Sequence, residues 1–216
     1  MNFKGFIFDL DGVLVDSIPL HYDAWHKTFS GYGYAFDEFI YREKVDGRPR
    51  MDAVRNIMIG ADERQMNEAS DIKQRHYLDM LEAGHLTTFS TTIPFIKKLK
   101  KDGILMAVAS SSINAKAILK SIGILDDFIA VVTADDITYG KPHPEIFLTA
   151  ASQMGLAPSE CVVLEDAQSG IQAAKSGNFY CIGVDRHQNP NYFLNADMVV
   201  KDIGDLNFEF TFPTAS

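Results

Sequence analysis

The sequence is poor in cysteine and in basic side chains. Only Cys161 and Cys181 occur among 216 residues, and they form no Cys-x-x-Cys pair or cluster with histidine. This predicts buried thiols in a reducing compartment rather than a disulfide framework or a zinc site. Twenty basic residues against 29 acidic ones leave a formal charge of −9, which disfavours binding to nucleic acid or to an anionic membrane surface.

Long apolar runs are also missing. No stretch approaches the roughly 18 residues that a membrane-spanning helix requires, and the N-terminal residues lack the pattern of a signal peptide. We therefore expect a cytoplasmic protein. With 46% hydrophobic and 23% charged residues, the composition is typical of a globular chain that buries a core. The length fits one large α/β domain or a core with a small added domain.

Short apolar runs rich in β-branched and aromatic residues predict strands buried on both faces, as in a parallel sheet. They are Phe3–Phe8, Ile104–Ala109, Phe128–Thr133, Cys161–Leu164 and Tyr180–Val184, with weaker runs at Met198–Val200 and Phe208–Phe212. Helical periodicity separates the later runs, at Ile93–Lys101, Ala115–Ile122, Pro144–Met154 and Ser169–Ser176. Thr92 and Asn114 are the expected caps of the first two helices. This alternation predicts a doubly wound, Rossmann-like α/β sheet.

A largely helical stretch interrupts the alternation after the first strand. Helical patterns cover Leu20–Ser30, Met51–Ile59 and Asp62–Ala83. A crossover between parallel strands needs only about 10–12 residues, far fewer than this chain uses. We therefore predict a helical domain over residues 16–85 that is inserted into an α/β core of residues 1–15 and 86–216.

Polar side chains follow the predicted strands at their carboxyl ends, where open α/β sheets bind ligands. Asp9 and Asp11 follow the first strand, Ser110, Ser111 and Ser112 the second, and Glu165 and Asp166 the fourth, while Lys141 lies in a connecting loop. Four carboxylates in one place repel one another unless a cation binds them. Oxygen ligands without cysteine or histidine favour Mg²⁺ over zinc. The set indicates phosphoryl transfer, with one carboxyl group as general acid and base.

These residues lie in motifs that resemble those of the haloacid dehalogenase superfamily. The run from Phe8 to Ser17 (FDLDGVLVDS) resembles its first motif. Ser110, Gly140-Lys141-Pro142 and Glu165-Asp166 resemble the other three, in the expected order, so the resemblance covers essentially the whole chain. It implies a Rossmann-like core with an inserted four-helix cap.

The resemblance also implies residue roles. Asp9 would be the nucleophile that forms an aspartyl-phosphate, and Asp11 the general acid and base. Ser110, Ser111 and Lys141 would bind phosphate. Mg²⁺ would be held by Asp9, the Asp11 carbonyl, Asp166 and Glu165.

Within the superfamily the chain is most similar to the β-phosphoglucomutase-like branch. The residues that carry this similarity are His21 and Trp25, the loop with Gly47 and Arg50, Lys73 with Tyr77, and the runs 109–114 and 164–171. By analogy Arg50 would bind the distal phosphate of a sugar bisphosphate. His21 and Lys73 would sense substrate, and Trp25, Gly47, Ser112 and Asn114 would contact it, although a His/Trp pair on one helix face is also a common packing arrangement.

Several functions remain open at this point. The first is a β-phosphoglucomutase, and the second is a phosphatase in which water accepts the phosphoryl group. Arg48-Pro49 departs from the small polar residues expected beside Arg50, which leaves the substrate open. A receiver-type signalling module would be about half this length, Asp11 argues against dehalogenation, and a phosphonatase would need Lys44 as a Schiff base. We expect a monomer acting on a small phosphorylated metabolite.

Overall fold

The computed structural model describes residues 3–45, 48, 50–186 and 193–206. The chain divides into two compact units, Met1–Asp16 with Thr88–Ser216, and Ser17–Thr87. We call them the sheet unit and the helical unit. The predicted strand Phe208–Phe212 and the site residue Gly47 lie outside the described residues.

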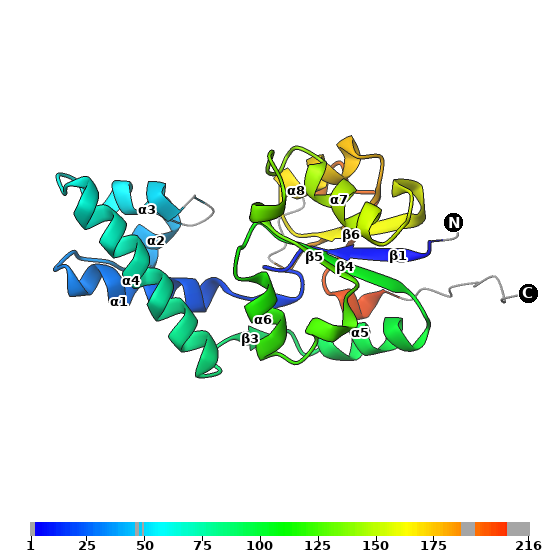
Figure 1. Ribbon diagram of the computed structural model, residues 1–216, viewed down its shortest axis with the longest axis horizontal. Coiled ribbons are helices and arrows are strands. Elements are labelled where there is room, and N and C mark those ends of the chain that lie inside the picture. Colours follow the sequence, from blue (N-terminus) through cyan, green and yellow to red (C-terminus); the bar gives the residue numbers. More distant parts are fainter. Residues whose placement is uncertain (1–2, 46–47, 49, 187–192, 207–216) are drawn as a thin grey trace, which may run out of the picture. The chain divides into compact units, whose positions relative to one another are not determined.

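The sheet unit contains six parallel strands in the order β5-β4-β1-β6-β7-β8 (Figure 1). The strands are β1 (Gly5–Phe8), β4 (Leu105–Ala109), β5 (Ala130–Val132), β6 (Cys161–Glu165), β7 (Tyr180–Val184) and β8 (Met198–Val200). From β1 the chain adds β4 and β5 toward one edge, then returns to add β6, β7 and β8 toward the other. The topological switch point, where such sheets bind ligands, therefore lies between β1 and β6. The predicted parallel, Rossmann-like sheet is confirmed.

Helices cover both faces of this sheet. α7 (Glu145–Gln153) and α8 (Gln168–Ser176) lie on one face, and α5 (Thr92–Lys101) and α6 (Ala115–Ser121) on the other (Figure 1). Because successive strand residues point to opposite faces, Ile7 packs with the α7 and α8 side, while Phe6 and Phe8 make edge-to-face contacts with Phe95 of α5. Short 3₁₀ turns occur at η1 (Leu125–Asp127), η2 (Ala134–Asp136), η3 (Pro158–Glu160) and η5 (Ile203–Asp205). Cys161 and Cys181 are buried free thiols, as predicted.

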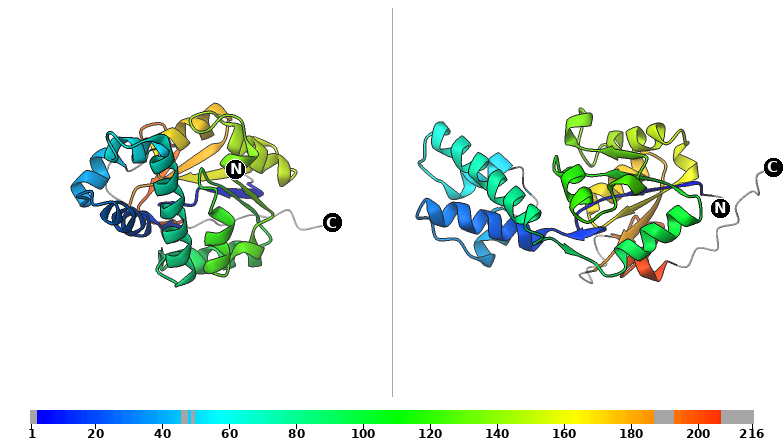
Figure 2. Two further views of the ribbon diagram at one scale, coloured as in Figure 1. Left: turned by 60° about the vertical axis from the view of Figure 1, so that its left-hand side comes forward. Right: turned by 60° about the horizontal axis from the view of Figure 1, so that its bottom comes forward.

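The helical unit consists of α1 (Ile18–Gly31), α2 (Glu38–Lys44), α3 (Arg50–Ile57) and α4 (Glu63–Glu82), with α1 packed along α4 (Figures 1 and 2). Its core gathers aromatic side chains, among them Trp25, Phe29 and Phe36. Asp62 and Gln65 form a capping box that begins α4. Among the described residues, no helix combines the length and the apolar character that crossing a membrane would require.

The boundary between the units differs in detail from the sequence pattern. A two-stranded sheet joins β2 (Val15–Asp16) to β3 (Thr87–Thr88), which are each too short to leave a periodic pattern. Thr92 does not cap α5, because Thr91 occupies the N-cap position. The fully buried Thr92 hydroxyl instead donates to the Leu14 carbonyl at 2.9 Å and so fixes α5 to the segment that leaves β1. Asn114 does occupy the N-cap of α6, but its side chain makes no capping hydrogen bond.

Candidate active site

The pairing of β1 with β4 and β6 places two predicted site residues, Asp9 and Glu165, at the same level of the sheet. Phe8 of β1 is paired with Val108 of β4 and with Leu164 of β6. The next residue of each strand is therefore Asp9, Ala109 and Glu165, side by side. The Asp9 amide donates to the Leu164 carbonyl at 2.9 Å, which fixes Asp9 at the switch point.

A tight turn follows Asp9 and contains Asp11. Gly12 has a φ of +79°, which favours glycine, and its amide donates to the Val15 carbonyl at 2.8 Å. A Cβ atom on Gly12 would lie 1.8 Å from Oδ2 of Asp166. Only glycine therefore lets this turn approach the Asp166 carboxylate in this geometry.

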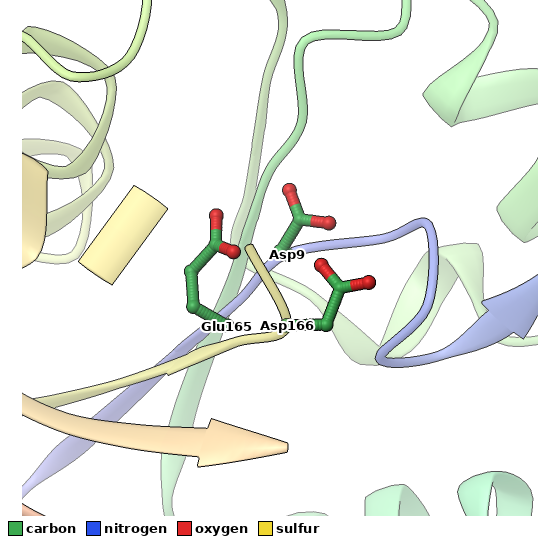
Figure 3. Close-up of side chains that lie close together, drawn as sticks. All are labelled: Asp9, Glu165 and Asp166. Atoms are coloured by element: carbon green, nitrogen blue, oxygen red, sulfur yellow. The ribbon is translucent and has the colours of Figure 1, made fainter. Parts of the chain in front are cut away.

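Three carboxylates converge at the strand ends. Asp9, Glu165 and Asp166 each offer an oxygen, and these oxygens lie within 4.8 Å of one another (Figure 3). Asp9 is 7% exposed and Glu165 is fully buried. Gly170 makes room for Glu165, because a Cβ there would lie 1.8 Å from Oε1. The Ala167 amide donates to Oε2 of Glu165 at 2.9 Å.

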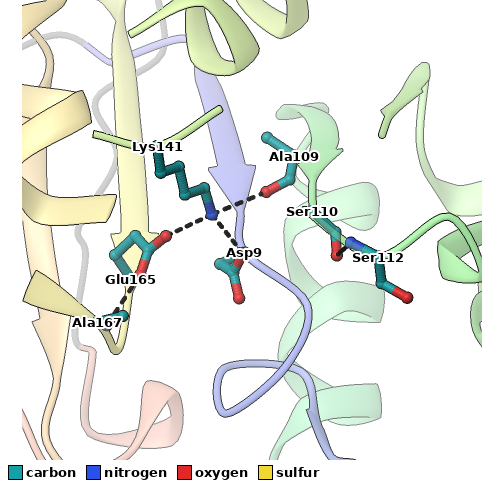
Figure 4. Close-up of polar contacts among 7 residues, drawn as sticks. All are labelled: Asp9, Ala109, Ser110, Ser112, Lys141, Glu165 and Ala167. Atoms are coloured by element: carbon teal, nitrogen blue, oxygen red, sulfur yellow. Dashed lines mark hydrogen bonds and ion pairs between the residues drawn. The ribbon is translucent and has the colours of Figure 1, made fainter. Parts of the chain in front are cut away.

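Lys141 joins two of these carboxylates. Its Nζ donates to Oδ1 of Asp9 and to Oε1 of Glu165, both at 2.5 Å, and to the Ala109 carbonyl at 3.3 Å (Figure 4). Burial alone would lower the pKa of Lys141, but the Asp9 and Glu165 carboxylates outweigh it and raise that pKa above its usual range. The side chain is therefore a cation at any physiological pH.

The acidic side chains carry more negative charge than Lys141 balances. Burial raises the pKa of Asp9 well above its usual value, with Lys141 opposing and the Glu165, Asp166 and Asp11 carboxylates adding to the rise. Burial and the Glu165 charge likewise raise the pKa of Asp166 to about 7. The Asp11 charge contributes to the raised pKa of both groups. Convergent carboxylate oxygens without cysteine or histidine fit a hard divalent cation such as Mg²⁺.

The predicted hydroxyl residues form a connected turn after β4. Ser110 is 1% exposed, and its amide donates to the Val132 carbonyl at 3.0 Å. The Ser112 amide donates to Oγ of Ser110 at 3.0 Å (Figure 4). The Asn114 amide donates to Oγ of Ser112 at 3.3 Å. Ser111 is exposed. This turn leads from the carboxyl end of β4, beside Asp9, into α6.

The other predicted residues lie in the helical unit. Nδ1 of His21 is 2.8 Å from Nζ of Lys73, and that ammonium lies 5.3 Å and 4.7 Å from the ring centres of Trp25 and Tyr77. Burial, followed by the charges of Lys73 and Arg50, lowers the pKa of His21 to about 3. The ring is therefore neutral, and its Nδ1 accepts from Lys73. The structure thus brings His21, Trp25 and Lys73 together, with the Arg50 charge close enough to act on His21.

Sequence reasoning missed two participants in the sheet unit. The Ala109 carbonyl contacts Lys141, and Gly170 makes room for Glu165. Strand register could have found the first, because Ala109 is level with Asp9 once β1 and β4 are aligned. Gly170 has no such signal, since its role depends on where the Glu165 side chain lies.

Known proteins resemble this chain over nearly all of its length. Residues 3–178 match the family model described as haloacid dehalogenase-like hydrolase. The chain is 36% identical over 213 residues to a β-phosphoglucomutase of Bacillus subtilis, and this match covers 95% of this chain and 92% of the relative. It is 31% identical over 205 residues to hexitol phosphatase A of Escherichia coli, with 94% and 93% covered. A crystal structure of β-phosphoglucomutase from Clostridium difficile has a TM-score of 0.79 at 29% identity, with 96% and 95% covered.

Proposed function

We propose that this protein, which belongs to the haloacid dehalogenase-like hydrolase family, transfers the phosphoryl group of a sugar phosphate through an aspartyl-phosphate at Asp9. Its relatives place it among the phosphomutases and phosphatases of the β-phosphoglucomutase-like branch. The observation that carries the proposal is the buried Asp9 carboxylate, hydrogen-bonded by the Lys141 ammonium at the switch point of the sheet. Asp9 can therefore act as a nucleophile next to the fixed positive charge of Lys141.

The transfer is a double displacement. An oxygen of the Asp9 carboxylate forms a bond to phosphorus while the bond from phosphorus to the sugar oxygen breaks, and Asp11 gives its proton to that leaving oxygen. An acceptor hydroxyl then loses its proton to Asp11, bonds to phosphorus and releases the Asp9 carboxylate. Lys141 balances the charge, and Ser110 and Ser111 bind phosphate oxygens.

Mg²⁺ is the cofactor that we propose for this site. Asp9, the Asp11 carbonyl, Asp166 and Glu165 would hold it, and the donor set of the carboxylate cluster fits such a cation. When bound, it supplies positive charge that neutralises the phosphate and offsets the repulsion among these carboxylates.

The acceptor decides between two activities. We propose a β-phosphoglucomutase, which converts β-glucose 1-phosphate to glucose 6-phosphate through the 1,6-bisphosphate, because the Bacillus subtilis relative has that name at 36% identity. The second candidate is a sugar-phosphate phosphatase, in which water is the acceptor, and hexitol phosphatase A at 31% identity favours it. On the resemblance we also assign substrate binding to six further described residues: His21, Trp25, Arg50, Lys73, Ser112 and Asn114.

Product analysis tests the proposal. The protein is supplied with Mg²⁺, β-glucose 1-phosphate and a trace of the bisphosphate, and glucose 6-phosphate and free phosphate are followed separately. We expect glucose 6-phosphate to accumulate with little phosphate release. Rapid phosphate release without isomerised sugar would instead identify a phosphatase. Asp9→Asn should abolish turnover and Asp11→Asn should remove most of it, and turnover retained in Asp9→Asn would exclude the aspartyl-phosphate.

A further inference from the structure

Arg186, which follows β7, contacts three separate segments of the sheet unit. Its Nε donates to the Gly12 carbonyl at 3.0 Å and its Nη2 to the Val13 carbonyl at 3.1 Å. Its Nη1 forms an ion pair with Asp202, at the start of η5. Its guanidinium carbon lies 3.5 Å from the ring centre of Phe89. The side chain is 12% exposed, so these contacts enclose it.

The two carbonyls that Arg186 binds belong to the turn that contains Asp11. Together with the bond from the Thr92 hydroxyl to the Leu14 carbonyl, three successive carbonyls of this segment accept from side chains that lie far away in the sequence. The same turn approaches Asp166 at Gly12. A displacement of the turn would therefore move Asp11 relative to Asp9 and Asp166.

The chemistry of arginine suits this task. Its guanidinium is planar and always charged, and its donors have fixed directions, so it binds two neighbouring carbonyls and a carboxylate at once. Asp202 is held in turn by the Gly204 amide, which donates to its Oδ1 at 2.7 Å. Stacking on Phe89 fixes the plane of the guanidinium. A lysine has a single ammonium and could not reproduce this set of contacts.

We propose that Arg186 is a positioning residue for Asp11, which it holds in reach of the leaving oxygen by fixing the Gly12 and Val13 carbonyls. The inference rests on the proposed role of Asp11 as general acid. It assigns Arg186 to the proton-transfer step and not to the attack of Asp9 on phosphorus. The two steps respond differently to the leaving group, which makes the assignment testable.

The experiment compares two esters in single turnovers. Formation of the phosphoenzyme is measured with β-glucose 1,6-bisphosphate, whose alkoxide leaving group needs a proton, and with p-nitrophenyl phosphate, whose phenolate does not. Rates are normalised to the folded fraction. We expect Arg186→Met to slow the reaction of the sugar ester at least about tenfold more than that of the nitrophenyl ester, about 1.4 kcal/mol of differential effect. Asp11→Asn should shift the ratio of the two rates in the same direction and further.

Lys175→Met is the matched control. Lys175 is another cation of the sheet unit, half-buried, which donates to Asp197 at 2.6 Å and to the Phe179 carbonyl at 3.3 Å. Removing it deletes an ion pair and a carbonyl contact that do not involve the turn, so the ratio should stay at the wild-type value. Arg186→Lys keeps a charge opposite Asp202 and covers the case in which Arg186→Met does not fold. It should still shift the ratio.

The opposite results would overturn the assignment. If the Arg186 variants slow both esters by the same factor, or slow neither, Arg186 only stabilises the fold. A wild-type ratio in folded Arg186→Lys would likewise show that the two carbonyl contacts do not position Asp11. If wild-type protein forms no phosphoenzyme from either ester, the proposed function itself is wrong, and this inference fails with it.

Discussion

At the scale of single residues, the site depends on a missing side chain as much as on those present. Gly12→Ala would place a Cβ atom against the Asp166 carboxylate and strain a backbone with a φ of +79°. We expect a loss of more than about tenfold in kcat, because Asp166 must move, on top of the about 1–2 kcal/mol of stability that left-handed backbone costs alanine. Activity assays and urea unfolding measure the two effects.

Gly123→Ala is the control that separates backbone strain from the contact with Asp166. Gly123 has a φ of +73°, but a Cβ there would meet nothing within 4 Å. Its alanine variant should lose a similar amount of stability and keep its kcat. Equal losses of kcat in the two variants would mean that backbone strain, and not the contact with Asp166, matters at Gly12.

Single residues also show how far sequence reasoning reaches into the site. Asp9 and Glu165 could be found because charged side chains at the ends of apolar strands are conspicuous. Lys141 lies in a loop and was found through the Gly140-Lys141-Pro142 motif. The structure does bring the three together. The contacts of Arg186 could not, because it binds main-chain carbonyls. Every residue has a carbonyl, so the sequence does not show which of them accepts a side chain.

At the scale of elements, α1 and α4 are linked by a neutral histidine that accepts from a lysine. The folded pKa of His21 is about 3, below its unfolded value of 6.5. Between these values the unfolded chain binds more protons, so stability is complete above about pH 6.5 and falls as the pH falls toward about 3. The slope for one such group is at most about 1.4 kcal/mol per pH unit.

The measurement is urea unfolding at pH 7 and pH 5. Wild-type protein should lose more stability between these values than His21→Asn, whose amide oxygen can accept from Lys73 but does not titrate. His26→Asn, at an exposed position of α1, is the control and should keep the wild-type pH dependence. An unchanged pH dependence in His21→Asn would show that protonation of His21 does not destabilise the fold.

Elements also differ in how well the sequence predicts them. The buried strands and α4 lie within about two residues of their predicted bounds because their periodic patterns are long or wholly apolar. α2 has no predicted counterpart, since only Tyr41 of its seven residues is buried. β2 and β3 have two residues each. An alternating pattern has a period of two residues, so strands this short cannot be predicted from it.

At the scale of the whole molecule, Arg50 of α3 is the residue of the helical unit whose proposed role requires a substrate with a second phosphate. If Arg50 binds the distal phosphate of a bisphosphate, Arg50→Ala should raise the KM for β-glucose 1,6-bisphosphate by about 10–100-fold, the loss of a charge-assisted contact worth about 1.5–3 kcal/mol. Hydrolysis of p-nitrophenyl phosphate, which has no second phosphate, should not change. Steady-state kinetics with both compounds measure this difference.

Arg55→Ala is the control for this prediction. Arg55 lies on the same helix, α3, and forms an exposed ion pair with Asp52 at 3.2 Å. Its loss should leave both KM values unchanged. An Arg50→Ala variant with an unchanged KM for the bisphosphate would contradict the distal-phosphate role and favour the phosphatase.

The central place of β1 also has a consequence for synthesis on the ribosome. Gly5 pairs with Leu105 and with Cys161, so the first strand to emerge waits for two later segments before it has neighbours on both sides. The helical unit, Ser17–Thr87, is continuous in sequence and can fold while the chain is still growing. β1 therefore lacks one of its two neighbours until β6 has been synthesised, and an apolar strand with an unpaired edge is prone to aggregation during that interval.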